Sequence, residues 1–211
     1  MRAQRAAVTP KGADRRERIL RALEELLETT PFAEIKIGQL TARAEVTRPG
    51  FYFYFPTKSA AVAALLEDLF EATHQVAASW YAGDHSEPVA AIAAVREGMA
   101  GTARLWREHA RIFRAMIEAA HADPEVGELW DAWRMAFVER VAARIALERE
   151  TGEMLPGPRA DLVAESLVGG VFFAMERDVA AVLAGTEGAL DELVDALVFV
   201  YANALYGEIR G

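Results

Sequence analysis

The chain has 211 residues, a net charge of −9 and no cysteine, and 53% of its residues are hydrophobic, so it is long and apolar enough to fold around a buried core. The missing cysteines exclude a disulfide framework and a thiolate zinc site, and the lack of a signal peptide or an apolar run of ~18 residues leads us to expect a protein of the bacterial cytoplasm. The charge is unevenly placed, because residues 1–58 carry a net charge of +4 and the remaining residues carry −13, so a polyanion is attracted by the first segment alone.

The first predicted element is a helix that opens at Asp14, with Glu17 three positions later as its capping partner, and ends at Thr29 to Pro31. Two short helices with a tight turn between them follow. The first spans 38–44, and Thr47 caps the second. A helix followed by two short helices is the layout of a helix-turn-helix domain, whose last helix lies in the major groove of DNA.

The second short helix contains five consecutive aromatic residues. We expect Phe51 and Phe55 to pack inward and Tyr52 and Tyr54 to present hydroxyl groups to DNA. The alternative is that the aromatic rings only hold neighbouring helices together.

Other residues near this helix also suit DNA. Arg48 can reach guanine or phosphate, Gly50 lets the backbone approach closely, and Lys58 lies at a helix N-terminus, where an anion is favoured. The full set of predicted DNA-binding residues is Gln39, Arg43, Thr47, Arg48, Pro49, Gly50, Tyr52, Tyr54 and Lys58.

The rest of the chain is also predicted to be helical, without a β-hairpin signal or an internal repeat, which gives an all-α protein of about nine helices. The expected boundaries are a helix from Thr57 to about Tyr81, a loop from Gly83 to Pro88 before the fifth helix, a seventh helix from Asp123-Pro124 to Thr151, and last helices at 160–184 and 189–209.

Ile35 to Leu40, followed by Ala44 to Lys58, resembles the DNA-binding signature of the tetracycline-repressor (TetR) family. Within that family, Phe51 to Pro56, with Glu128-Leu-Trp130 and Tyr206-Gly-Glu208, is similar to the EthR branch. Two positions depart from the family pattern. Lys36 stands where Ser or Thr often caps the second helix, and Glu45 stands where the turn usually has Gly, at a cost of ~1 kcal/mol if the turn is left-handed.

The resemblance implies a basic arm and helix-turn-helix DNA-binding domain at 1–57 and an effector-binding and dimerisation domain at 58–211. It also implies a homodimer that forms through the last two helices and binds a palindromic double-stranded operator. We expect helix 8, with Gly169 and Gly170, and the apolar face of helix 9 to form that interface; the alternative is that this face covers only the core of one subunit. The arm residues expected to hold DNA are Arg2, Arg5, Lys11, Arg15 and Arg16.

Large apolar side chains recur at helical spacing through helices 5 to 8, which is typical of an ordinary helical core. The resemblance implies instead a ligand cavity between helices 4, 5, 7 and 8, suited to an elongated hydrophobic effector. The predicted lining is Met99, Trp106, Phe113, Trp133, Phe137, Phe172, Met175 and Tyr201.

Enzyme signatures are weak. Glu118-x-x-His121 is half of a di-iron motif without a second copy, and no phosphate-binding or hydrolase motif occurs, so we expect no catalytic residue, metal or cofactor. The sequence favours a ligand-responsive transcriptional regulator, most simply a repressor released by its effector. The alternative is a hydrophobic-ligand carrier or a helical metalloenzyme with a non-functional helix-turn-helix.

Overall fold

The computed structural model describes residues 10–83 and 87–207, and this part of the chain folds into nine α-helices and one short 3-10 helix, without strands. No helix in these ranges is both long and apolar enough to cross a membrane. The elements are α1 (Pro10–Leu27), η1 (Phe32–Glu34), α2 (Ile37–Arg43), α3 (Arg48–Tyr54), α4 (Lys58–Tyr81), α5 (Pro88–Glu108), α6 (Ala110–Ala122), α7 (Pro124–Thr151), α8 (Ala160–Ala184) and α9 (Leu190–Leu205).

Side-chain caps begin three of these helices where the sequence predicts them. Thr47 accepts a hydrogen bond from the Gly50 amide at 3.2 Å, and Thr57 accepts one from the Ala60 amide at 2.9 Å. Asp123 caps α7 in the same way. Each cap satisfies an amide that has no partner within the first turn, and this explains why these three helix starts were predicted well.

Two predicted helix boundaries are wrong, the start of α1 and the end of α9. Asp14 does not cap α1, because the helix already begins at Pro10; the Asp14 carboxylate lies one turn before Arg18, 3.5 Å from its Nε. Helix α9 ends at Leu205 rather than 209, since Gly207 has a left-handed φ of +81° that a continuing helix excludes.

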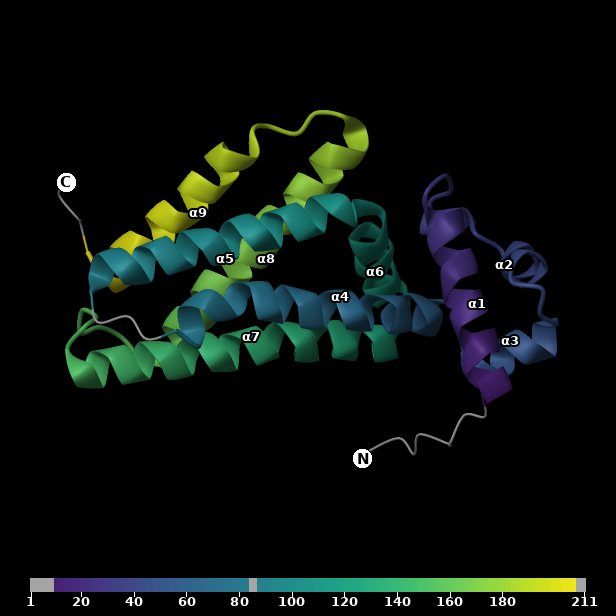
Figure 1. Ribbon diagram of the computed structural model, residues 1–211, viewed down its shortest axis with the longest axis horizontal. Helices are drawn as coiled ribbons and strands as arrows, with labels where there is room; N and C mark the ends of the chain where they lie inside the picture. Colours follow the sequence, from purple (N-terminus) through teal and green to yellow (C-terminus); the bar gives the residue numbers. More distant parts are fainter. Residues whose placement is uncertain (1–9, 84–86, 208–211) are drawn as a thin grey trace.

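Helices α1–α3 gather at one end of the molecule, while α4, α5, α7, α8 and α9 form an elongated bundle beyond them (Figure 1). Helix α4 begins against the α1–α3 group and continues through the bundle, where it packs on α5. The two helices approach closely at Gly101, where an added Cβ would lie 2.0 Å from Val76 Cγ1, so a larger residue would force them apart. Because α4 is continuous from Lys58 to Tyr81, it joins the α1–α3 end of the molecule to the bundle.

Candidate nucleic-acid interface and ligand cavity

Helix α3 has a buried side and an exposed side. Phe51 and Phe55 are buried, as predicted, and their rings contact each other. Tyr52 is 48% exposed, whereas Tyr54 is half-buried and packs against the core. The most exposed ring belongs to Phe53, at 82%, a residue that the sequence reasoning did not single out. Counting helical positions from the cap at Thr47 could have placed the Phe53 side chain on the outward face of the helix.

The start of α3 is closely packed around its cap. Arg48 and Pro49 are exposed, and Gly50 is half-buried. A Cβ added at Gly50 would lie 3.1 Å from Thr47 Oγ1, so the glycine leaves room for the capping hydroxyl. This gives the glycine a local packing reason, and the close approach to DNA suggested from sequence remains a prediction.

The predicted DNA-facing residues of α2 make contacts within the protein. Gln39 Oε1 accepts a hydrogen bond from the Lys36 amide at 2.8 Å, which satisfies the amide of the N-cap residue itself, although Lys36 supplies no side-chain cap to the first turn of α2. Arg43 Nε donates to Glu25 Oε2 at 2.5 Å, with both side chains about half exposed. Both residues remain near the surface, and Arg43 must exchange its carboxylate partner to contact a phosphate.

The turn between α2 and α3 is left-handed at Glu45, with φ of +52°, as its position opposite the family glycine suggested. Its carboxylate lies 3.7 Å from the Arg18 guanidinium, an exposed ion pair that offsets little of the backbone strain.

Lys58 occupies an unexpected position. Its Nζ donates to the Phe32 carbonyl at 2.6 Å and to the Ile35 carbonyl at 2.8 Å, and lies 4.2 Å from the centroid of the Phe32 ring. Burial lowers the pKa of Lys58, and the charge of Glu118 partly opposes that shift. Lys58 therefore ties η1 to the first turn of α4; the phosphate contact suggested from sequence remains a prediction.

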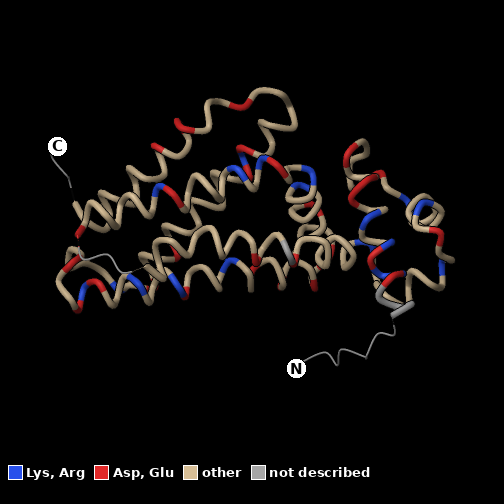
Figure 2. Tube along the Cα trace, viewed as in Figure 1, with Lys and Arg blue, Asp and Glu red and all other residues tan. Residues whose placement is uncertain are grey.

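The basic arm is described only in part. Arg2 and Arg5 lie outside the described residues, as does the side chain of Lys11. Arg15 is exposed, and the Arg16 guanidinium lies 5.6 Å from the centroid of the Phe55 ring. Figure 2 shows Lys and Arg interspersed with acidic residues over α1–α3, so any positive surface there is local.

The bundle holds an apolar cavity of about 70 Å³, bordered by α4, α5, α7, α8 and α9. Val95 and Trp106, at two ends of its α5 wall, are separated by eleven residues, ~16 Å along a helix, so the cavity is elongated. Six of the eight residues predicted from sequence border it: Met99, Trp106, Phe137, Phe172, Met175 and Tyr201. Residues missed by the sequence reasoning include Thr73, Trp80, Tyr81 and Thr102.

Phe113 and Trp133 do not border the cavity. Phe113 is fully buried and stacks on Trp106, with ring centroids 4.1 Å apart. Trp133 stacks on Phe70, with ring centroids 4.6 Å apart, about one turn before Thr73 on α4. Phe113 packs behind Trp106 of the lining, and Trp133 packs on Phe70, which in turn contacts Phe137 of the lining. Contact of either residue with a ligand remains a prediction.

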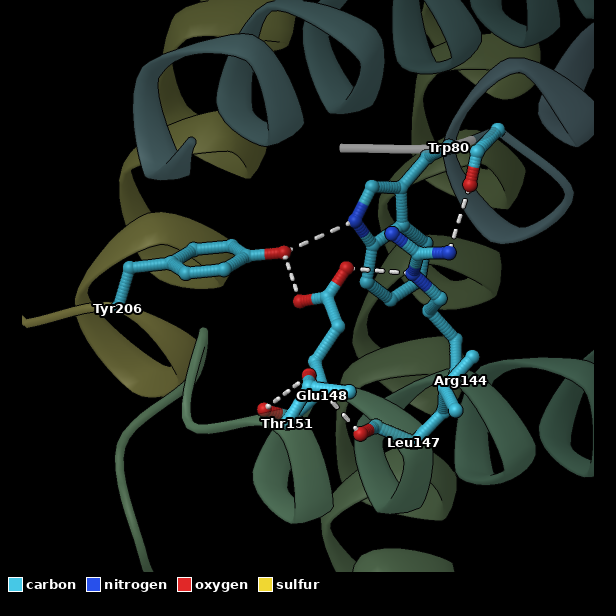
Figure 3. A network of polar contacts seen from close by, with 7 residues as sticks. Trp80, Arg144, Leu147, Glu148, Thr151 and Tyr206 are labelled. Carbon is cyan, nitrogen blue, oxygen red and sulfur yellow. Dashed lines mark hydrogen bonds and ion pairs between the residues drawn. The ribbon is translucent and has the colours of Figure 1, made fainter. Parts of the chain in front are cut away.

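A buried polar network closes the far end of the bundle (Figure 3). Trp80 Nε1 donates to the Tyr206 hydroxyl at 3.1 Å, and this hydroxyl donates to Glu148 Oε2 at 2.7 Å. Arg144 forms an ion pair with Glu148 and donates to the Gly83 carbonyl at 2.6 Å. Burial and the bond to Glu148 raise the pKa of Tyr206. The network holds Trp80 at one end of the cavity wall.

His74 lies behind the wall and stacks on Phe137, with centroids 3.7 Å apart. Its pKa is lowered to about 4, chiefly by burial and then by the charge of Arg140, whose Nη1 lies 3.1 Å from Nδ1. His74 is therefore neutral near pH 7.

The half di-iron motif is engaged in structural contacts. Glu118 pairs with Arg114 at 2.8 Å, and His121 Nδ1 lies 2.7 Å from the Ile117 carbonyl. No group of three His, Asp or Glu suited to a metal ion occurs within the described ranges.

Comparisons with known proteins agree with this arrangement. Residues 19–65, which include α2 and α3, match the family described as bacterial regulatory proteins, tetR family, and residues 95–207 match the C-terminal domain of the transcriptional regulator EthR. The HTH-type transcriptional regulator EthR of Mycobacterium tuberculosis is 31% identical over 98% of this chain and 94% of its own. The chain belongs to the EthR branch of the TetR family.

Further relatives of this TetR-family protein support the assignment. EthR of Mycolicibacterium smegmatis is 30% identical over 97% of this chain and 92% of its own length. The structure of a SmeT–triclosan complex has a TM-score of 0.67 at 20% identity, covering 91% of both chains. Salmonella enterica GusR has a TM-score of 0.66 at 14% identity and covers 94% of this chain and 98% of its own, so the fold is shared well beyond close sequence similarity. Because it belongs to this family, the chain is a ligand-responsive transcriptional regulator rather than an enzyme.

Proposed function

We propose that the protein is a homodimeric repressor that binds a palindromic operator through α2, α3 and the basic arm, and that a hydrophobic effector in the bundle cavity releases it. The observation that carries the proposal is the course of α4. This helix begins at Lys58, which holds η1 of the DNA-binding end, and its later turns border the cavity at Thr73 and Trp80. We place the domain boundary between residues 57 and 58, at the start of the same helix.

The exposed side of α3 supplies the DNA contacts in this proposal. Arg48 suits a guanine edge or a phosphate, and the Tyr52 hydroxyl suits a phosphate oxygen. Phe53 has no polar group, so it fits the methyl group of thymine in the major groove.

The effector acts by shifting a population of conformations. A cavity of about 70 Å³ holds only a few water-sized groups, so an elongated ligand must move side chains or helices to enter. Movement of α4 would change the spacing of the two recognition helices in a dimer, which must lie roughly 34–36 Å apart to enter successive major grooves.

Helices α8 and α9 supply the proposed dimer interface. Phe173 on α8 is 62% exposed, and Phe199 and Val200 on α9 are 69% and 54% exposed. A Cβ added at Gly169 or Gly170 meets no atom of the described chain within 4 Å, so these glycines have no packing reason within one subunit. An apolar surface beside small residues suits the close approach of a second copy.

Operator binding is tested with duplexes selected from a random pool, and affinity is measured by fluorescence anisotropy at several salt concentrations. Tyr52→Phe and Phe53→Ala should each weaken binding by about 1 kcal/mol or more, and Phe53→Ala should also relax the preference for thymine at one position. The control, Val89→Ala, changes an exposed apolar residue at the start of α5. Unchanged affinity in both α3 variants would refute this assignment of the DNA surface.

The interface is tested by sedimentation of Phe199→Glu, which should be monomeric and bind the palindrome more weakly. Val89→Glu is the matched control, because Val89 is also 69% exposed but lies outside α8 and α9. A dimer that persists in Phe199→Glu would place the interface elsewhere.

A further inference from the structure

Three polar groups of the cavity wall lack hydrogen-bond partners. Tyr201 is only 4% exposed, and neither its hydroxyl nor that of the buried Thr102 has a partner among the residues that the structure describes. The Nε1 atom of Trp106, one turn after Thr102 on α5, is buried and also unpartnered within the described chain. A fully buried donor without an acceptor, such as Trp106 Nε1, is unfavourable by ~1–3 kcal/mol, and two unpartnered hydroxyls on the same cavity wall require a reason as well.

Other polar groups of the same wall are satisfied by the protein. Thr73 donates to the Leu69 carbonyl at 2.8 Å, and the Tyr81 hydroxyl donates to the His74 carbonyl at 2.5 Å. The unpartnered donors are therefore a property of particular positions and not of the cavity as a whole.

The unpartnered groups lie at two places along the cavity. Arg96 of α5 pairs with Asp195 of α9, and the two helices run antiparallel (Figure 1). Thr102 lies six residues after Arg96, toward the C-terminal end of α5. Tyr201 lies six residues after Asp195 on α9, and because the helices are antiparallel this places it beside the N-terminal part of α5. Each step of six residues is ~9 Å along a helix. The Tyr201 ring contacts Trp80, at the opposite end from Trp106. We refer to these places as the Tyr201 end and the Thr102 end.

No Lys, Arg, His, Asp or Glu belongs to the described lining of the cavity. A carboxylate or ammonium group placed there would lose its hydration without gaining a counter-ion, which is strongly unfavourable. The cavity therefore selects against charged ligands.

We propose that the effector is an elongated, uncharged molecule with a hydrogen-bond acceptor toward each end, such as a carbonyl or ester oxygen, and an apolar segment between them. The Tyr201 hydroxyl donates to one acceptor, and the Thr102 hydroxyl with the Trp106 indole N–H donates to the other. This inference rests on the proposed function, since it names the class of ligand that the cavity of this regulator takes.

The test uses dimethyl suberate, a neutral diester, and measures its dissociation constant from the fluorescence of the cavity tryptophans. Loss of one neutral hydrogen bond should raise that constant about three- to tenfold in Thr102→Val and in Tyr201→Phe. Thr73→Val is the matched control, because it removes a hydroxyl of the same wall whose hydrogen bond is already made within α4, and it should leave the constant unchanged.

Two further probes separate polarity from shape. Butylbenzene, which has no acceptor of this kind, should bind the wild type and the Thr102→Val and Tyr201→Phe variants equally, which also shows that these variants fold. The suberate dianion should bind at least tenfold more weakly than the diester. No binding of the diester, an equal loss in Thr73→Val, or equal binding of the dianion would overturn the inference.

Operator release is measured in parallel by anisotropy. If butylbenzene releases the operator while the hydroxyl variants bind the diester normally, the proposed function stands and the ligand class is wrong. If the diester binds as expected but operator affinity does not change, the ligand class stands and effector-controlled release is wrong.

Discussion

Substitution of Lys58 by methionine tests how the DNA-binding end is attached to the bundle. Methionine keeps the apolar stem and removes the ammonium group that bonds to the carbonyls of Phe32 and Ile35. Both acceptor residues are buried, so their carbonyl oxygens cannot simply turn to bulk water.

Hydrogen bonds to a charged group contribute ~1.5–3 kcal/mol each, and two are lost. Lys58 itself is only partly buried and its pKa is lowered by desolvation, so the lower part of that range applies. We therefore expect the free energy of unfolding to fall by about 3 kcal/mol.

The free energy is measured by urea unfolding, with Lys36→Met as the control, since Lys36 is an exposed lysine of the same region whose side chain makes no hydrogen bond in the described chain. A loss below about 0.5 kcal/mol, the level of an ordinary surface substitution, would refute the clamp. Operator binding separates the second role: if Lys58 also neutralises a phosphate, the salt slope becomes shallower by ~0.9, whereas a purely structural role leaves the slope unchanged.

Three further predictions concern the wall, the turn and the cavity. The pKa of His74 is about 4 in the folded protein against an ordinary 6.5, so as the pH falls the unfolded chain takes up a proton before the folded chain does. The free energy of unfolding should therefore fall by about 1–3 kcal/mol between pH 6.5 and pH 4. Urea unfolding midpoints should fall less over this pH range in His74→Phe. The free energy of unfolding of Glu45→Gly should be about 1 kcal/mol higher than that of Glu45→Ala, because only glycine relieves the left-handed backbone strain. Equal free energies for the two variants would contradict that account. Met99→Trp should fill the cavity and abolish the response of operator affinity to dimethyl suberate, and a wild-type response would place the effector elsewhere.

Local patterns were sufficient for much of the fold. Thr47, Thr57 and Asp123 each cap the helix that follows them, and a cap depends only on residues within one turn. The inward position of Phe51 and Phe55 follows from the same register. Asp14 was misleading because a suitable capping side chain also fits inside a helix, where it pairs with Arg18.

The sequence by itself determined the all-helical class, the helix-turn-helix and the family, because these are carried by periodicity and by one contiguous signature. Only the tertiary structure showed that Lys58 bonds to carbonyls of η1, that Phe113 and Trp133 stand behind the cavity wall, and that the hydroxyls of Tyr201 and Thr102 lack partners in the described chain. Each of these depends on which faces of helices distant in sequence meet. Helical spacing identifies an apolar face, but the neighbour that covers it is set by the packing of the whole bundle.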